Sequence, residues 1–213
     1  MVEKIKFYSM WIALLLIVVY FLQVFLQGFT EFFILTQDAF MFPWKFLSAI
    51  FLHADLIHLL YNLFALIFFG LILEKLIGSR RFIYLFMISG ILVNVISFSF
   101  YPSSLGASGA IMAVLAVVAV LRPLMMVWAF GIILPMFLLA LIWAIGSVMG
   151  VFGLGDSGVG HIAHLSGLVI GAVYGFYLRV RKNKHLKNSV HFKSKIILPE
   201  NYMQSWENRF LKG

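Results

Sequence analysis

Side chains suited to hydrolytic chemistry occur at three separate places in an otherwise apolar sequence. His58 and Asn62 stand four residues apart, Ser108 lies among small residues, and His164 opens an apolar segment. A serine hydroxyl, an imidazole base and further hydrogen-bond donors are the groups needed for nucleophilic attack on a carbonyl. Because residues four apart point from one helix face, His58 and Asn62 can act on the same group. These types and spacings predict a carbonyl-hydrolysing site, provided that the fold brings the three places together.

Ser108 is the predicted nucleophile. The segment from Ser104 to Ala110 reads SLGASGA and marks the point where a loop enters a helix, so the backbone there can approach a substrate closely. The free N–H groups and the positive dipole end of a helix N-terminus favour negative charge, which is what an oxyanion carries. We therefore expect Ser108 to attack and its own N–H to be one oxyanion donor.

The segment from Gly160 to Gly167 offers two candidate bases, His161 and His164, three residues apart. Glycines then follow at every fourth position, a repeat that lets membrane helices pack closely. We expect this repeat to bring the last span, and His164 with it, against the span that begins at Ser108. The glycines are Gly167, Gly171 and Gly175.

The composition identifies the bilayer as the solvent of this chain. Of its 213 residues, 63% are hydrophobic and only 11% are charged, and the mean hydropathy is +1.03. Soluble domains are closer to half apolar and a quarter charged. The apolar blocks are roughly 17 to 25 residues long, enough to cross about 30 Å of hydrocarbon. We predict an all-α membrane protein, a bundle of six transmembrane helices. The predicted spans are residues 7–26, 50–73, 82–100, 107–121, 124–145 and 162–179.

Charge placement predicts the orientation of the bundle. Six spans put both termini on one side, and that side receives fifteen of the sixteen Lys and Arg residues. Positive residues favour cytoplasmic loops, so we expect the N-terminus and the C-terminus to be cytoplasmic. Only Lys45 falls on the opposite side. The second, fourth and sixth spans then begin in the outer leaflet, which puts all three chemical places at one depth.

Two connecting segments differ from the rest by composition. The loop 28–49 is rich in aromatic residues, which suits a segment lying in the outer interface. The segment 146–160 is dense in glycine, and this predicts a mobile flap leading into the last span. We expect Gly153 and Gly155 of the flap, with Met112 of the fourth span, to gate the access of a substrate.

The chain is expected to divide into a membrane domain, residues 1–180, and a basic cytosolic tail, residues 181–213. Nine of the sixteen Lys and Arg residues lie from Arg179 to Lys212, where anionic lipid head groups explain them better than nucleic acid does. The first apolar block has no small-residue cleavage site, so we interpret it as a retained span rather than a signal peptide. The absence of cysteine excludes disulfides and thiolate metal sites.

Three motifs, in order, resemble those of the rhomboid family of intramembrane serine proteases. They are the segment Trp44 to Asn62, with its histidine and asparagine four residues apart, the segment Gly106 to Gly109, and the segment Ala163 to Gly171. Glu74 and Gly78 also fit a Glu-x-x-x-Gly pattern that is common in the family. Together these matches are more specific than any one of them.

The resemblance implies a rhomboid-like six-helix bundle and a role for each matched residue. Ser108 would be the nucleophile and His164 the general base and acid, a Ser-His dyad. His58 and Asn62, with the N–H of Ser108, would stabilise the oxyanion. The implied activity is a serine endopeptidase of the cell membrane that cleaves single-span transmembrane proteins near the outer leaflet, without a metal or a cofactor.

Two positions depart from the family pattern. The family usually has an aromatic residue four positions after the serine, stacked on the catalytic histidine, whereas this chain has Met112. A thioether can still pack on a ring face. Lys45 stands where arginine is frequent, and we expect a looser loop because lysine cannot form two forked bonds.

Structural alternatives exist for the same residues. A serine or an amide within membrane helices often serves only to tie helices together, which applies most to Asn62. His53 and His161 are expected to be interfacial residues near water. Asp55 and Asp156 are the acids closest to the predicted depth, and both fall in loops or at a span end, so a dyad is favoured over a triad.

Three other functions compete with the protease interpretation. An inactive rhomboid-like scaffold would lack the serine or the histidine, and both are present. A metal-dependent membrane hydrolase or transporter would need ligands, for which His53, His58, His161 and His164 are the candidates, but neither a His-Glu-x-x-His motif nor an intramembrane carboxylate supports it. A channel or carrier would show inverted repeats or broken helices in matching halves, and the sequence shows no such repeat.

Overall fold

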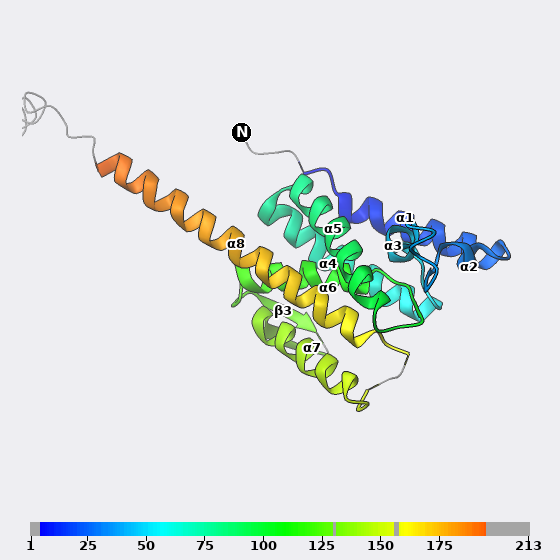
Figure 1. Cartoon of the computed structure of the whole chain (residues 1–213). Helices are drawn as coiled ribbons and strands as arrows, with labels where there is room; N and C mark the ends of the chain where they lie inside the picture. The colour runs from blue at the N-terminus through cyan, green and yellow to red at the C-terminus, as the bar shows by residue number, and fades with distance from the viewer. Residues whose placement is uncertain (1–4, 130, 156–157, 195–213) are drawn as a thin grey trace, which may run out of the picture. The chain divides into compact units, whose positions relative to one another are not determined.

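The structure is a computed structural model that describes residues 5–129, 131–155 and 158–194, which are mostly helical (Figure 1). They fall into two compact units, Met1–Phe176 and Tyr177–Gly213, and the first contains every predicted site residue. Asp156 of the predicted flap and the predicted tail beyond Ser194 lie outside the described residues. The elements are α1 (Tyr8–Phe25), α2 (Phe29–Phe33), β1 (Leu35–Thr36), α3 (Lys45–Ser48), the 3₁₀ turn η1 (Ala49–Phe51), α4 (Leu56–Ile77), α5 (Ser79–Phe98), β2 (Ser103–Ser104), α6 (Ser108–Leu121), β3 (Met126–Ala129), β4 (Ile132–Pro135), α7 (Met136–Val151) and α8 (His161–Ser194).

Four helices of the described chain are long and apolar enough to cross a membrane, namely α1, α4, α5 and the part of α8 over His161–Arg181. The other two apolar helices, α6 with 14 residues and α7 with 16, are shorter than the roughly 20 residues of a full crossing. Each of the six predicted spans overlaps one of the six long apolar α-helices, in the predicted order. The prediction that all six cross, with both termini cytoplasmic, stays a prediction.

The central helix of the first unit is α6. All of its residues from Gly109 to Ala119 are buried, and it packs against α4, α5 and α7. Its contact with α8 is closer still, because a methyl group on Gly167 would lie 2.1 Å from the carbonyl oxygen of Gly109. One turn on, a methyl group on Gly171 would lie 2.2 Å from the carbonyl oxygen of Ala113. The two helices thus run parallel with touching backbones, which confirms the packing predicted from the glycine repeat.

A buried carboxylate joins α1, α4 and α5. Glu74 of α4 is 1% exposed, and its two oxygens accept hydrogen bonds from the N–H groups of Tyr8 and Ser9 and from the hydroxyls of Ser9 and Ser79, at 2.7 to 3.1 Å. The residue before α1, Phe7, supplies no side-chain cap. Glu74 therefore caps α1 from another helix, because first-turn N–H groups have no partner within their own helix. We call these four residues the Glu74 junction.

The predicted fifth span, residues 124–145, is wrong over its first half. The strands β3 (Met126–Ala129) and β4 (Ile132–Pro135) pair as an antiparallel hairpin, and Gly131 between them has a φ of +80°, which favours glycine. Pro135 is the residue directly before α7, so the helix starts only at Met136. The helix then continues to Val151, which places part of the predicted flap 146–160 inside α7. An apolar run without a clear period does not distinguish strand from helix, and this accounts for the error.

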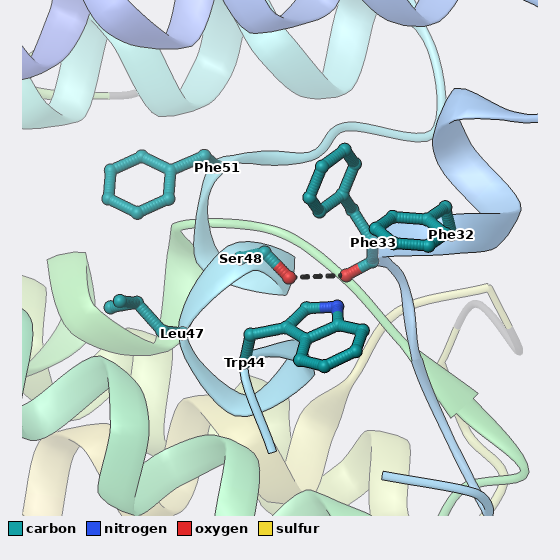
Figure 2. A pocket seen from close by; sticks show the side chains of 6 residues that line it. All are labelled: Phe32, Phe33, Trp44, Leu47, Ser48 and Phe51. Carbon is teal, nitrogen blue, oxygen red and sulfur yellow. Dashed lines mark hydrogen bonds between the residues drawn. The ribbon is translucent and has the colours of Figure 1, made fainter. Parts of the chain in front are cut away.

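The loop 28–49 holds structure of its own, including α2, α3 and β1. Its aromatic side chains surround an open hollow of about 500 Å³, and Figure 2 shows the Ser48 hydroxyl donating a hydrogen bond to the carbonyl of Phe33 at 2.7 Å. The rings of Phe32 and Trp44 stack in the same hollow, with centroids 5.7 Å apart. None of the predicted catalytic residues lines it. The lining residues are Phe32, Phe33, Trp44, Leu47, Ser48 and Phe51.

Candidate active site

Ser108 is the first residue of the buried helix α6. The preceding Ala107 supplies no side-chain acceptor to the first turn, and a helix N-terminus favours negative charge. Gly106 has a φ of +119°, which other residues rarely adopt, and its N–H donates to the carbonyl of Ala49 at 2.9 Å. The short pairing of β1 with β2 holds the same approach from the side of the loop 28–49. Local backbone geometry thus fixes the serine where the sequence predicted it.

His58 lies in the first turn of α4 and reaches the serine loop. Asp55 caps this helix by accepting a hydrogen bond from the N–H of His58 at 2.7 Å, so the predicted second span starts at Leu56 rather than at residue 50. The N–H of Ala54 faces His58 Nδ1 at 3.5 Å, which leaves Nε2 on the other side of the ring. A methyl group on Gly106 would lie 3.0 Å from His58 Nε2 and 3.9 Å from Ser108 Oγ. Both atoms therefore border the same small volume.

Asn62 is buried one turn after His58 on the same helix. Its side-chain amide donates to the carbonyl of His58 at 2.9 Å, which occupies one of its two N–H donors. This contact supports the helix locally and leaves a second donor for an oxyanion. The geometry is compatible with both interpretations of Asn62 that the sequence left open.

His164 is buried at the start of α8, at the same end of the parallel pair as Ser108. Its ring meets the ring of Trp143 from α7 edge to face, with centroids 6.2 Å apart, and the ring of His161 at 6.4 Å. Among the described residues, no hydrogen bond joins the Ser108 hydroxyl to the His164 imidazole. Such bonds often tighten only when a substrate is bound. The backbone contact of α6 with α8 puts the two residues at the same end of the helix pair, and the Trp143 ring makes an aromatic contact with His164 that Met112 cannot make.

The expected gating residues lie in different surroundings. Met112 is buried in the contact between α6 and α8, where a methyl group on Gly167 would lie 3.1 Å from its Cβ. Gly153 has open space around its Cα, whereas a methyl group on Gly155 would lie 3.0 Å from His161 Nε2. The flap thus rests on His161 through Gly155, and its gating role stays a prediction.

A family comparison accounts for the order of these motifs. The family model of the rhomboid domain matches residues 42–181, about two thirds of the chain and all of the predicted catalytic positions. The chain belongs to the rhomboid family. This family includes intramembrane serine proteases, and several curated relatives are named as rhomboid proteases.

Three relatives show how far the similarity of this rhomboid extends. RHOMBOID-like protein 4 of Arabidopsis thaliana is 33% identical over 142 residues, which cover 65% of the chain and 34% of that protein. Rhomboid protease GlpG of Haemophilus influenzae is 29% identical over 143 residues, 66% of the chain and 72% of that protein. Rhomboid protease GluP of Bacillus subtilis is 43% identical over 70 residues, 32% of the chain and 14% of that protein. The chain therefore spans only about a third of the Arabidopsis relative's length.

One contact near the site of this rhomboid was missed by the sequence reasoning. The hydroxyl of Tyr101, in the loop after α5, accepts a hydrogen bond from the N–H of Ile162 at 3.0 Å. That N–H belongs to the first turn of α8, two residues before His164. Gln37 of the loop 28–49 donates in turn to the carbonyl of Tyr101 at 3.0 Å. No local motif predicts such a cap, because the donor and acceptor residues are 61 positions apart in the chain.

His53 differs from its prediction. It was expected near water, but its side chain is 1% exposed and lies against the ring of His58 at 5.0 Å. Gln23 of α1 holds the backbone of His53 in this position by two hydrogen bonds, donating to the carbonyl and accepting from the N–H. Within the described part of the chain, neither ring nitrogen of His53 has a hydrogen-bond partner. No group of three or more His, Asp and Glu side chains there is arranged to hold a metal ion.

Lys45 holds the loop 28–49 more firmly than expected. Its buried ammonium group donates to both carboxylate oxygens of Asp38, at 2.8 and 2.9 Å, and to the hydroxyl of Thr36 at 2.8 Å. The hydrogen bonds from Lys45 and Thr36 lower the pKa of Asp38 below its usual 3.8. Lysine has three donors, which is enough to close this loop without the fork of an arginine.

Proposed function

We propose that this rhomboid is an intramembrane serine endopeptidase that uses Ser108 and His164 as a catalytic dyad. The observation that carries the proposal is the parallel backbone contact between α6 and α8, which brings the two residues to one end of the helix pair. The position of His58 Nε2 beside Gly106 supports it further, because an oxyanion formed at Ser108 needs donors there.

In the proposed reaction, His164 accepts the proton of the Ser108 hydroxyl as its oxygen attacks the peptide carbonyl of a substrate. The imidazole of His58, the free amide donor of Asn62 and the N–H of Ser108 stabilise the oxyanion. His164 then gives its proton to the leaving amine. A water molecule, activated by the same histidine, releases the second product from Ser108. The Trp143 ring holds the His164 ring edge-on through these steps.

The proposed substrates are single-span transmembrane proteins, cleaved near the outer leaflet. The peptide bond must leave its helix to be attacked, so residues that unwind a helix favour cleavage. The charge distribution supports the proposed orientation, with six spans, both termini cytoplasmic and the active site toward the outside. The cell membrane as the location belongs to this proposal. The family itself does not determine the membrane, because relatives include proteins named as mitochondrial and chloroplastic.

The direct test is cleavage of a model single-span substrate in liposomes that contain the purified protein. The wild type should produce two fragments whose new ends, read by mass spectrometry, lie in the membrane segment. Ser108→Ala and His164→Ala should give no fragments above background, while Ser89→Ala, another buried serine, should cleave as the wild type does. Cleavage by Ser108→Ala at the wild-type rate would refute the proposal, and insensitivity of the wild type to a chelator would argue against a metal mechanism.

A further inference from the structure

The hairpin β3–β4 has one face on the protein and one apolar face outside it. The cross-strand pair Val127 and Leu134 is buried, whereas the next pair, Trp128 and Ile133, is 63% and 68% exposed. In an antiparallel ribbon with one face in water, the outward side chains would be polar. Here Met126 joins them on the outward face, and the chain from Arg122 to Pro135 contains no acidic residue. The outward face is therefore unsuited to water.

The hairpin is fixed at the end of α6 that lies away from the catalytic residues. The helix has 14 residues, so its last turn is about 20 Å from Ser108 at 1.5 Å per residue. Two backbone hydrogen bonds fasten the segment that leads into the hairpin to the first turn of α7, from the Met136 N–H to the carbonyl of Met125 at 2.9 Å and from the Phe137 N–H to that of Pro123 at 3.0 Å. Figure 1 shows β3 beside α7.

The lipid-facing surface of α7 continues directly onto this hairpin. Phe137, Leu138 and Leu141 of α7 are exposed apolar residues of a membrane protein, and the outward residues of the hairpin precede them in the chain. A two-stranded ribbon leaves unpaired N–H and C=O groups on its edges, which are costly in the hydrocarbon core. The head-group layer satisfies both requirements, because it receives apolar side chains and hydrogen-bonds the edges. Tryptophan is enriched in that layer, and exposed Arg122 at the base suits lipid phosphates.

We propose that the paired strands β3 and β4 form an interfacial anchor that binds the phospholipid head-group layer of the leaflet opposite to Ser108. The anchor sets the depth at which α7 enters the membrane, and α7 is the helix whose Trp143 contacts His164. The proposal depends on membrane embedding alone and not on protease activity.

Quenching of tryptophan fluorescence by brominated phospholipids tests this anchor in liposomes that hold the whole chain. Lipids with bromine near the head group should quench a component that disappears in Trp128→Phe, while lipids with bromine near the chain ends should quench wild type and Trp128→Phe alike. Trp11→Phe is the matched control, because Trp11 is equally exposed at 64% on the spanning helix α1. Its loss should leave the Trp128 component in place.

Two results would overturn the anchor. Trp128→Phe could retain the full head-group quenching, which would place Trp128 in water or behind protein. Alternatively, disulfide cross-linking between copies that carry Trp128→Cys could occur at high yield in dilute liposomes, with no lipid quenching at Trp128, and the face would then be covered by a second chain. Circular dichroism of each variant establishes that its helices are formed.

Discussion

The two ends of the first unit differ in how completely their buried polar groups are hydrogen-bonded. At the Glu74 junction, each carboxylate oxygen accepts two hydrogen bonds, and three helices are tied together. At the site around Ser108, Asn62 has used one donor, while neither ring nitrogen of the neighbouring His53 has a partner among the described residues. Paired groups stabilise a fold, and groups with unused hydrogen-bonding capacity are available to a reacting molecule.

This difference predicts that residues at one end of the unit determine its stability and residues at the other end determine its reactivity. A change at the Glu74 junction should lower the free energy of unfolding and leave the reactivity of folded protein alone. A change at the Ser108 site should do the reverse. Measuring both the thermal unfolding temperature and the cleavage rate for each variant therefore tests the comparison itself.

The largest effect on rate, short of the dyad residues, is expected for Asn62→Ala. Loss of one oxyanion donor costs about 2.7 to 4 kcal/mol, or a rate about 100 to 1,000 times lower, with little change in unfolding temperature. Asn94→Ala is the matched control, because the Asn94 amide is also buried but donates to the carbonyl of Phe46. Asn94→Ala should lower stability and leave the rate of folded protein unchanged. Equal rates for Asn62→Ala and the wild type would make Asn62 a structural amide.

Glu74→Ala should have the largest effect on stability. It leaves four donors without an acceptor, and we expect a loss of about 3 kcal/mol in the free energy of unfolding. Chemical denaturation in detergent measures this loss. Glu74→Gln retains an acceptor oxygen and should recover part of that loss. Lys75→Ala, at the exposed neighbouring position, should change little. A strongly reduced cleavage rate in folded, stable Glu74→Gln would contradict the separation of the two ends.

Tyr101→Phe should lower the cleavage rate by a smaller factor. The hydroxyl caps the helix that carries His164, and the loss of such a cap costs about 1 kcal/mol, near fivefold in rate. The structure gives Tyr101 a contact with α8, so an effect through the position of His164 should lower kcat and leave KM the same. Tyr84→Phe makes the same chemical change at an exposed position of α5 and should leave both constants unaltered. A change confined to KM would mean that Tyr101 binds substrate instead.

The smallest effect is expected at the ion pair of Asp38 and Lys45. Since the pKa of Asp38 is lowered in the fold, its contribution to stability is present above the usual value of 3.8 and is lost as the pH falls through the lower folded value. Asp38→Asn should therefore unfold at a slightly lower temperature than the wild type at neutral pH. The two unfolding temperatures should converge in strong acid. A constant difference at all pH values would exclude this ion pair as its cause.

Periodic signals in the sequence predicted the part of the site that depends on helix packing. Gly167 and Gly171 recur at helical spacing, so the contact of α8 with α6 was foreseeable, and the position of Ser108 at a helix start followed from its small neighbours. The hairpin β3–β4 was not foreseeable, because its apolar run lacks the alternation of a half-exposed strand.

Contacts between distant loops and helices could not be predicted from the sequence. Tyr101 and Trp143 reach α8 only through the tertiary fold, and neither stands in a motif with His164. His53 was misjudged for a similar reason, since the residue that holds its backbone, Gln23, comes from the first helix. Such side chains carry no local pattern, so only the folded chain identifies them.

The central claim is that Ser108 is a nucleophile activated by His164, and labelling with a fluorescent fluorophosphonate measures this most directly. In detergent, the purified wild type and the Ser89→Ala variant should be labelled. The Ser108→Ala and His164→Ala variants should not be labelled. Circular dichroism and size-exclusion chromatography of all four establish that they are folded. The predicted result is labelling of the wild type and of the Ser89→Ala control, and of neither of the other two variants. Equal labelling of Ser108→Ala and wild type, or none of the folded wild type under conditions in which a known serine hydrolase reacts, would contradict the account.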